Sequence, residues 1–210
     1  LPATTLTRGC YRGMFSGNTG LTSTPELPAT KMAPLCYYFM FSGCSNITTA
    51  PQLPSTELAD SCYMTMLQAT GLKAAPVLPA TTLANGCYYN MFRSCKDLAT
   101  APVLPATTLA DNCYEYMFHG CLSLTKAPVL PATTLAPSCY FGMFVNCTGL
   151  TEAPELPATD MVKSCYLGMF YNSGLTVAPV LPATTLAPTC YKQMFTGCTN
   201  LVEVPTLSAT

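Results

Sequence analysis

The sequence has few charged side chains and almost no net charge. Lys, Arg, Asp and Glu make up 9% of its 210 residues, and the formal net charge is −1, whereas about a quarter of the residues in an ordinary globular domain are charged. Binding to nucleic acid or to an acidic membrane surface needs a concentrated basic patch. This composition cannot supply one, so we expect no nucleic-acid partner.

Long apolar runs and a signal segment are also missing. No apolar stretch approaches the roughly 18 residues of a membrane-spanning helix, so we expect no direct membrane insertion. The chain opens on Leu1 without a Met or a signal-like segment. Both Leu1 and Leu207 begin repeating units that lack a polar cap, which solenoids need to stay monomeric. We therefore expect a fragment of a longer chain, with any signal or anchor outside it, and self-association through the uncapped ends.

Residues for catalysis are scarce. The sequence has one histidine, His119, and the nearest acidic candidate partner in the same repeat is Asp111. No activated nucleophile accompanies them. The equivalent positions of other repeating units hold Ser16, Gln68 and Arg93, so the residue type at the His119 position varies from unit to unit. We expect this position to be exposed. We predict that the protein is not an enzyme and has neither catalytic residues nor a cofactor.

What the sequence has in abundance is repetition, with the consensus LPATTLAxxCYxxMFxGCxxLxxAPx. Tandem repeats at this period indicate a single solenoid, in which each unit buries its apolar face against its neighbours. The units are 1–26, 27–52, 53–77, 78–103, 104–129, 130–155, 156–180 and 181–206, and the start of a ninth occupies 207–210.

Each unit contains a segment with helix-compatible spacing, such as Cys87–Phe92. In six of the eight units, Pro, Asp or Asn precedes the segment, as at the first turn of a helix. In six of the eight units, Gly or Asn stands two residues after the Phe, and such a residue commonly ends a helix in the left-handed conformation. The pattern predicts a helix of about two turns in every unit.

The other limb of each unit is rich in proline. Since proline cannot donate a hydrogen bond to a central sheet, Pro102 and Pro105 leave room for a strand of two to four residues near Thr100–Ala101. The rest of the limb should be extended and polyproline-like. The predicted fold class is therefore α/β, a solenoid of short strands and two-turn helices.

Thirteen cysteines form two columns, one complete and one broken. No paired Cys-x2-Cys spacing occurs, so we expect no metal site. Disulfides between neighbouring units are an alternative, because stacked equivalent positions lie about 5 Å apart. Parallel side chains and an odd total favour buried thiols instead. The tyrosine after each first cysteine could stack on a glycan or single-stranded nucleic acid, but a row present in every unit favours a packing ladder.

The motif CYxxMFxGCxxLxxAPxLP resembles the BspA-like leucine-rich-repeat family of bacterial surface proteins. It appears as MFSGCSNI from Met40, MFHGCLSL from Met117 and MFTGCTNL from Met194. The resemblance implies a right-handed leucine-rich-repeat-like solenoid that is secreted to the bacterial cell surface and acts in adhesion to host or bacterial proteins. It implies no catalytic residues.

Two variable columns flank the Ala-Pro pair of the limb. They place a short apolar stripe between charged margins, which is typical of a modest protein interface. The alternative is that the valines only pack against neighbouring prolines. We expect binding of a protein, or a glycan, in the middle units, and the predicted contact residues are Val77, Val103, Lys126, Val129, Glu152 and Glu155. A structural spacer, or an element that assembles end to end into a filament, is the alternative function.

Overall fold

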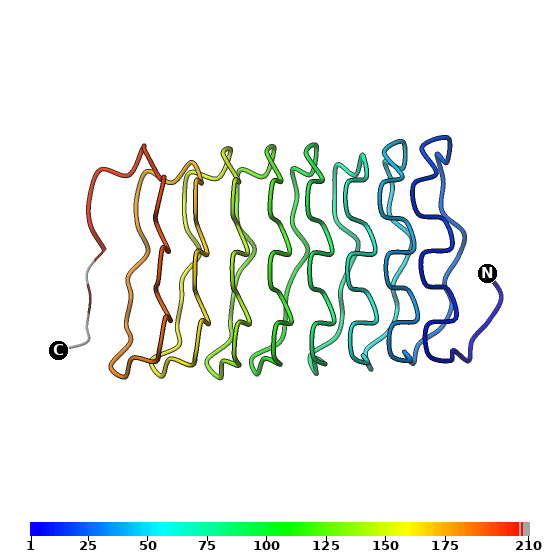
Figure 1. Ribbon diagram of the computed structural model, residues 1–210, viewed down its shortest axis with the longest axis horizontal. Helices are drawn as coiled ribbons and strands as arrows, with labels where there is room; N and C mark the ends of the chain where they lie inside the picture. The colour runs from blue at the N-terminus through cyan, green and yellow to red at the C-terminus, as the bar shows by residue number, and fades with distance from the viewer. Residues whose placement is uncertain (206, 208–210) are drawn as a thin grey trace.

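The chain folds into a stack of coils that follow one another in sequence order (Figure 1). The computed structural model describes residues 1–205 and residue 207. Each coil has a zigzag segment on one face of the stack and a smoother segment on the other, and the first and last units lie at opposite ends. The architecture is therefore repetitive, with one coil for each sequence unit.

The zigzag segments are runs of consecutive turns, ten residues long in every unit. We call them turn runs, and they span residues 8–17, 34–43, 60–69, 85–94, 111–120, 137–146, 163–172 and 188–197. Both 25-residue units keep the full ten residues. Their missing residue therefore falls in the limb, which we define as the chain between two successive turn runs.

Backbone hydrogen bonds in a turn run alternate between two kinds of partner. In the fourth unit, the Tyr89 N–H donates to the Gly86 carbonyl three residues earlier, over 3.1 Å. The next N–H, that of Asn90, donates to the Glu115 carbonyl of the following unit, over 2.9 Å. The same alternation continues along the run. Half of the donors thus close local turns and the other half tie neighbouring units together.

This arrangement contradicts the predicted α/β fold of two-turn helices. No helix occurs in residues 1–205 or at 207, and Cys87–Phe92 lies within a turn run. An α-helix would direct every N–H to the carbonyl four residues earlier. Here each second N–H points along the stack instead, because its acceptor lies on the next unit.

The turn runs place every fourth residue in the left-handed region. In the sixth unit these residues are Ser138, Gly142 and Asn146, with φ of 55°, 57° and 59°. Each one is the third residue of a hydrogen-bonded turn, the position where type II turns need a positive φ. Gly or Asn occupies many of these left-handed positions, and both tolerate this conformation better than other residues. The Gly or Asn predicted to end a helix is only the last of the three.

Two consecutive residues point into the core and the next two point out. In the second unit, Cys36, Tyr37, Met40, Phe41 and Cys44 are at most 1% exposed. Tyrosine rings of successive units stack with centroids 5.6 to 5.9 Å apart. A parallel phenylalanine stack accompanies them, interrupted at Leu67. The tyrosine ladder is thus a packing element, as its presence in every unit predicted.

The second cysteine column has a hydrogen-bonding role that the sequence did not reveal. The Cys121 thiol donates to the Phe92 carbonyl oxygen of the preceding unit at 3.2 Å, and Cys147 does the same to Phe118 at 3.0 Å. In the third unit, which lacks this cysteine, the Thr70 hydroxyl donates to the Leu67 carbonyl of its own unit at 2.8 Å, not to the preceding unit. The column therefore tolerates a hydroxyl in place of a thiol.

The limbs pair only through single residues. Parallel bridges join Ala74 to Thr100 and Lys126 to Glu152, among others. The expected strand of two to four residues at Thr100–Ala101 is therefore reduced to a bridge at Thr100. Proline on the carboxyl side, at Pro102 and Pro105, removes the N–H groups that a longer ladder would need.

Candidate binding surface on the proline-rich limb

The limb holds its side chains in a regular order. The segment Lys126–Pro131, where the fifth unit passes into the sixth, runs as Lys-Ala-Pro-Val-Leu-Pro, and Glu152–Pro157 repeats it where the sixth unit passes into the seventh. Leu130 is 2% exposed and anchors the segment in the core, whereas Val129 is 78% exposed. Prolines on both sides of the valine restrict the backbone. The Val129 side chain is therefore exposed on a segment whose backbone is held by the neighbouring prolines.

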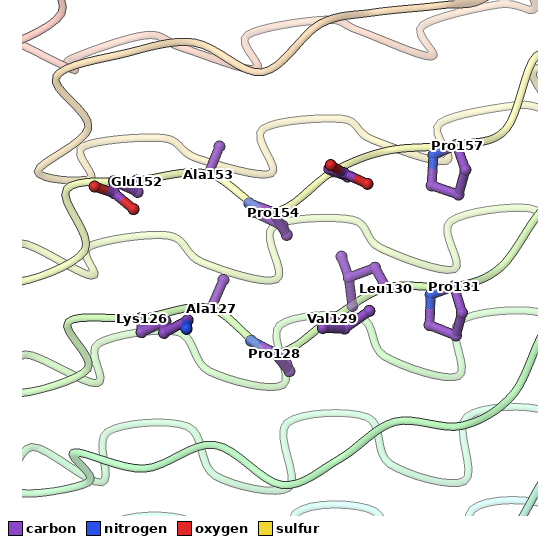
Figure 2. A pocket seen from close by; sticks show the side chains of 11 residues that line it. Lys126, Ala127, Pro128, Val129, Leu130, Pro131, Glu152, Ala153, Pro154 and Pro157 are labelled. Carbon is purple, nitrogen blue, oxygen red and sulfur yellow. The ribbon is translucent and has the colours of Figure 1, made fainter.

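A hollow of about 400 Å³ lies between these two neighbouring segments. Figure 2 shows Lys126 and Glu152 at equivalent points of the two limbs, with Pro128, Pro131, Pro154 and Pro157 along them. Val129 and Glu155 complete the part of the lining that can vary between units. The hollow is thus apolar along its length and carries charges of both signs at its margins.

Four of the six predicted contact residues come together in this hollow. They are Lys126, Val129, Glu152 and Glu155. Val77 and Val103 do not line it. They occupy the same column of the third and fourth units and are 71% and 77% exposed. The three valines therefore stand outside the core in consecutive units, instead of being covered by the prolines beside them.

The charged groups at the margin are not paired with each other. Among the described residues, the ion pair that forms is Lys31–Glu57, with 3.6 Å between Nζ and Oε2. Lys126 and Glu152 are bridged through their backbones, but their side chains make no such pair. Both charges are therefore available to a ligand.

Similar hollows recur where other limbs meet. One of about 300 Å³ lies between the sixth and seventh units and includes Glu155 and Val180. Another of about 370 Å³ lies between the first and second units, with Glu26 and Gln52 at the variable positions. The shape is thus a property of the repeat, and the variable columns give each hollow its own chemistry.

Sequence reasoning missed a second surface, on the outward side of the turn runs. Tyr89 and Tyr116 meet edge to face at 6.5 Å, and Phe141 lies 4.8 Å from Tyr116. Burial beside them raises the pKa of the Glu115 carboxyl to about 7. These residues stand in the two adjacent variable positions that follow the buried tyrosine in each unit. A repeat period of four residues is the signal that could have revealed it.

His119 is half-buried, which corrects the expectation of an exposed position. Its Nε2 lies 3.4 Å from the Asn146 amide nitrogen, and burial together with Arg93 lowers the pKa of the imidazole. This environment favours the neutral ring. Its partner is thus an amide on the next unit.

The cysteines are unpaired and nearly all buried. Each of the thirteen is a free thiol, and Cys10 alone is exposed. Burial raises the pKa of Cys87 and of Cys139 to about 12. The described residues contain no group of three His, Cys, Asp or Glu side chains arranged to hold a metal ion. The same part of the chain has no helix able to cross a membrane.

Comparison with family models, curated proteins and solved structures found no match to this chain.

Proposed function

We propose that this chain is a binding module whose proline-rich limb recognises an extended protein segment. The hollow between Lys126–Pro131 and Glu152–Pro157 carries this proposal, since it combines an apolar, proline-lined trough with charges at its rim. The exposed valines of the preceding units lengthen the apolar surface. A partner segment with a small apolar side chain and a neighbouring basic group would complement it.

Rigidity supports a binding role for the limb. Proline restricts the backbone before a ligand arrives, so less conformational entropy is lost on binding. The bridges and turn-run hydrogen bonds hold neighbouring limbs in register. Variable side chains on a constant frame are the usual way in which repeat proteins obtain specificity.

The proposal includes secretion to a bacterial cell surface and a role in adhesion. This part rests on the resemblance of the repeat motif to BspA-like proteins alone. The structural alternative, a spacer, would give no reason for the lining to vary from unit to unit. The variation at Lys126, Val129, Glu152 and Glu155 favours binding.

Selection from a random linear-peptide display library on the 210-residue chain tests the proposal. We expect peptides whose affinity falls at least tenfold, or about 1.4 kcal/mol, in the Val103→Asp, Val129→Asp double variant. The two new carboxylates would be desolvated against the apolar part of the peptide. Circular dichroism should stay unchanged, since both valines are exposed.

The matched control is Val204→Asp, which places a carboxylate at an 89% exposed valine far from the middle units. It should bind the selected peptides like the unmodified chain. A glycan array probed in parallel would assign a carbohydrate partner if the double variant lost its signals. Peptides that bind the double variant at full affinity would contradict a limb site, and a selection without any binder would favour the spacer.

A further inference from the structure

The outward side of the turn runs holds a cation over an aromatic ring. The guanidinium carbon of Arg12 lies 4.9 Å from the centroid of the Tyr38 ring. The two residues occupy equivalent positions of the first and second units, each directly after the buried tyrosine. The face of an aromatic ring attracts a cation, and a planar guanidinium stacks on it well. This position of the repeat can therefore place a guanidinium over a tyrosine of the following unit.

The fourth unit presents a tyrosine at the same position, but its neighbour is uncharged. The tyrosine is Tyr89, and the third unit holds Met64 where the first unit holds Arg12. Tyr89 is half-buried, and the ring of Tyr116 meets it edge to face at 6.5 Å. These contacts restrict the orientation of the Tyr89 ring, while Met64 supplies no cation to it.

A hollow of about 410 Å³ adjoins Tyr89 at the start of three successive turn runs. Met64 and Tyr89 form its apolar part. Gly86, with φ of 58°, contributes no side chain to fill it. Its polar part consists of carboxyl and amide side chains, which are those of Asp60, Asn85, Asn112 and Glu115. The lining that the structure describes thus combines an aromatic ring with two carboxyl groups and contains no basic residue.

The Glu115 carboxyl is poorly solvated in this hollow. Burial raises its pKa to about 7. Burial and, after it, the Glu115 charge raise the pKa of the Tyr89 hydroxyl, so the carboxyl group and the phenol lie close together. A cation bound beside them would stabilise the carboxylate that burial disfavours. Asp60, which is exposed, adds a second negative charge at the rim.

We propose that the hollow beside Tyr89 binds a guanidinium group, carried by an arginine side chain of a partner or by a free guanidinium compound. The group would lie over Tyr89 as that of Arg12 lies over Tyr38. Its N–H groups would donate to the carboxylates of Glu115 and Asp60. Arginine fits better than lysine, because a guanidinium is planar and more weakly hydrated than an ammonium. The site lies on the turn runs and is separate from the hollows of the limb.

Titration of the 210-residue chain with Nα-acetyl-arginine amide tests the site. The NMR signals of the Tyr89 and Glu115 amides should shift and saturate at pH 8, with a Kd of about 1 mM. Nα-acetyl-citrulline amide has nearly the same shape but no charge, so it should bind at least tenfold more weakly. Free arginine and agmatine identify the source of the group. Tighter binding of either would indicate a small molecule, and tighter binding of the blocked arginine would indicate a partner's side chain.

Variants of the lining locate the site. Glu115→Gln should weaken binding of the blocked arginine at least tenfold at pH 8, because it removes the charge. The matched control is Glu203→Gln, at an exposed glutamate outside the hollow, which should leave the affinity unchanged. Met64→Arg would give the hollow its own guanidinium, as Arg12 gives one to Tyr38, and should block binding at least tenfold. Met64→Leu should bind within twofold of the unmodified chain.

The pH dependence supplies an independent test. The ionised share of a carboxyl with a pKa of about 7 rises from about one tenth at pH 6 to about nine tenths at pH 8, so the affinity should rise about tenfold. Asp60 is the other acid of the lining. Arg93 and His119 lie near Tyr116, and burial followed by Arg93 lowers the pKa of His119. Glu115→Gln should abolish the rise, since these other groups remain.

Three outcomes would overturn the proposal. They are equal affinity for the arginine and citrulline compounds, full affinity in Glu115→Gln, and no saturable shift at Tyr89 or Glu115. The Val103→Asp, Val129→Asp double variant should bind the blocked arginine normally, because its substitutions lie on the limb. The guanidinium site and peptide binding by the limb can therefore fail separately.

Discussion

Replacing Gly168 by alanine separates the turn run from the helix that the sequence suggests. Gly168 lies in the middle of the run 163–172, with φ of 57°. Inside an α-helix, a change from glycine to alanine stabilises the fold by about 1 kcal/mol. In the turn run, the same substitution forces an L-residue into the left-handed region. The two structures therefore predict effects of opposite sign.

The magnitude follows from two opposing contributions. The left-handed conformation costs an alanine roughly 1–2 kcal/mol. The smaller conformational freedom of alanine in the unfolded chain returns about 0.4–1 kcal/mol. No atom lies close enough to obstruct a Cβ at Gly168, since the nearest is the Tyr171 Cβ at 4.0 Å. We expect Gly168→Ala to lower the free energy of unfolding by about 0–1.6 kcal/mol.

Two other glycines serve as matched comparisons. Gly20 has no positive φ and nothing within 4 Å of an added Cβ, so Gly20→Ala should be neutral or stabilise by up to about 1 kcal/mol. Gly142 has φ of 57°, like Gly168, but its Cβ would also run into the Tyr116 ring. Gly142→Ala should therefore cost about 1–3 kcal/mol more than Gly168→Ala.

Urea unfolding followed by circular dichroism measures all three variants. The difference between Gly168→Ala and Gly20→Ala cancels the unfolded-state contribution and leaves the conformational cost of roughly 1–2 kcal/mol. If Gly168→Ala stabilises the protein as much as Gly20→Ala does, the alternating turn structure is wrong at this position.

Three further predictions concern the core and one half-buried carboxyl. Cys121→Ala should lower the free energy of unfolding by about 1–2 kcal/mol, because it removes the hydrogen bond to Phe92 and leaves a cavity. Cys121→Ser keeps a hydrogen-bond donor and should lower the free energy of thermal unfolding less. Equal losses in the two variants would contradict the role of the donor. Alkylation at pH 8 should modify Cys10 in the native chain and spare the buried thiols, such as Cys87, whose pKa burial raises to about 12. Unfolding without a reductant should make all thirteen thiols reactive. Cysteines that react only after reduction would indicate disulfides. Because burial raises the pKa of Glu115 from 4.5 to about 7, the folded state retains a proton that the unfolded state releases between these values, so stability should fall as pH rises through this interval and level off above it. The Glu115→Gln variant should show a smaller drop in melting temperature between pH 5 and pH 8, and an unchanged drop would assign it to another group.

The positions of the repeat that form the core could be predicted, because the same apolar residues recur there in every unit and charged residues are absent from them. Charged residues avoid the Cys, Tyr, Met and Phe columns throughout the sequence, and burying an unpaired charge is costly. The structure confirms that these columns form the core. The outward position of Val77, Val103 and Val129 follows from the same pattern. The hollow beside Val129 could not be predicted, since its shape depends on how neighbouring limbs lie against each other.

The helix was the main error, and the reason is the length of the segment. In Cys87–Phe92, apolar pairs recur every four residues, which differs little from a helical period of 3.6 over so short a stretch. Gly or Asn recurs every four residues in many units, at positions such as Gly86, Asn90 and Asn112. The helix prediction treats only the last of these positions as left-handed. All three together would have favoured successive turns.

The sequence by itself determined the repeat, the side chains that form the core and the proline-rich limb, because each depends on composition and spacing within one unit. Tertiary structure decided the backbone of the turn runs. A helix satisfies its N–H groups within one segment, but here every second donor finds its acceptor 24 or 25 residues away on the next unit. Such a conformation is stable only when units stack, since an isolated run would leave half of its donors without a protein partner.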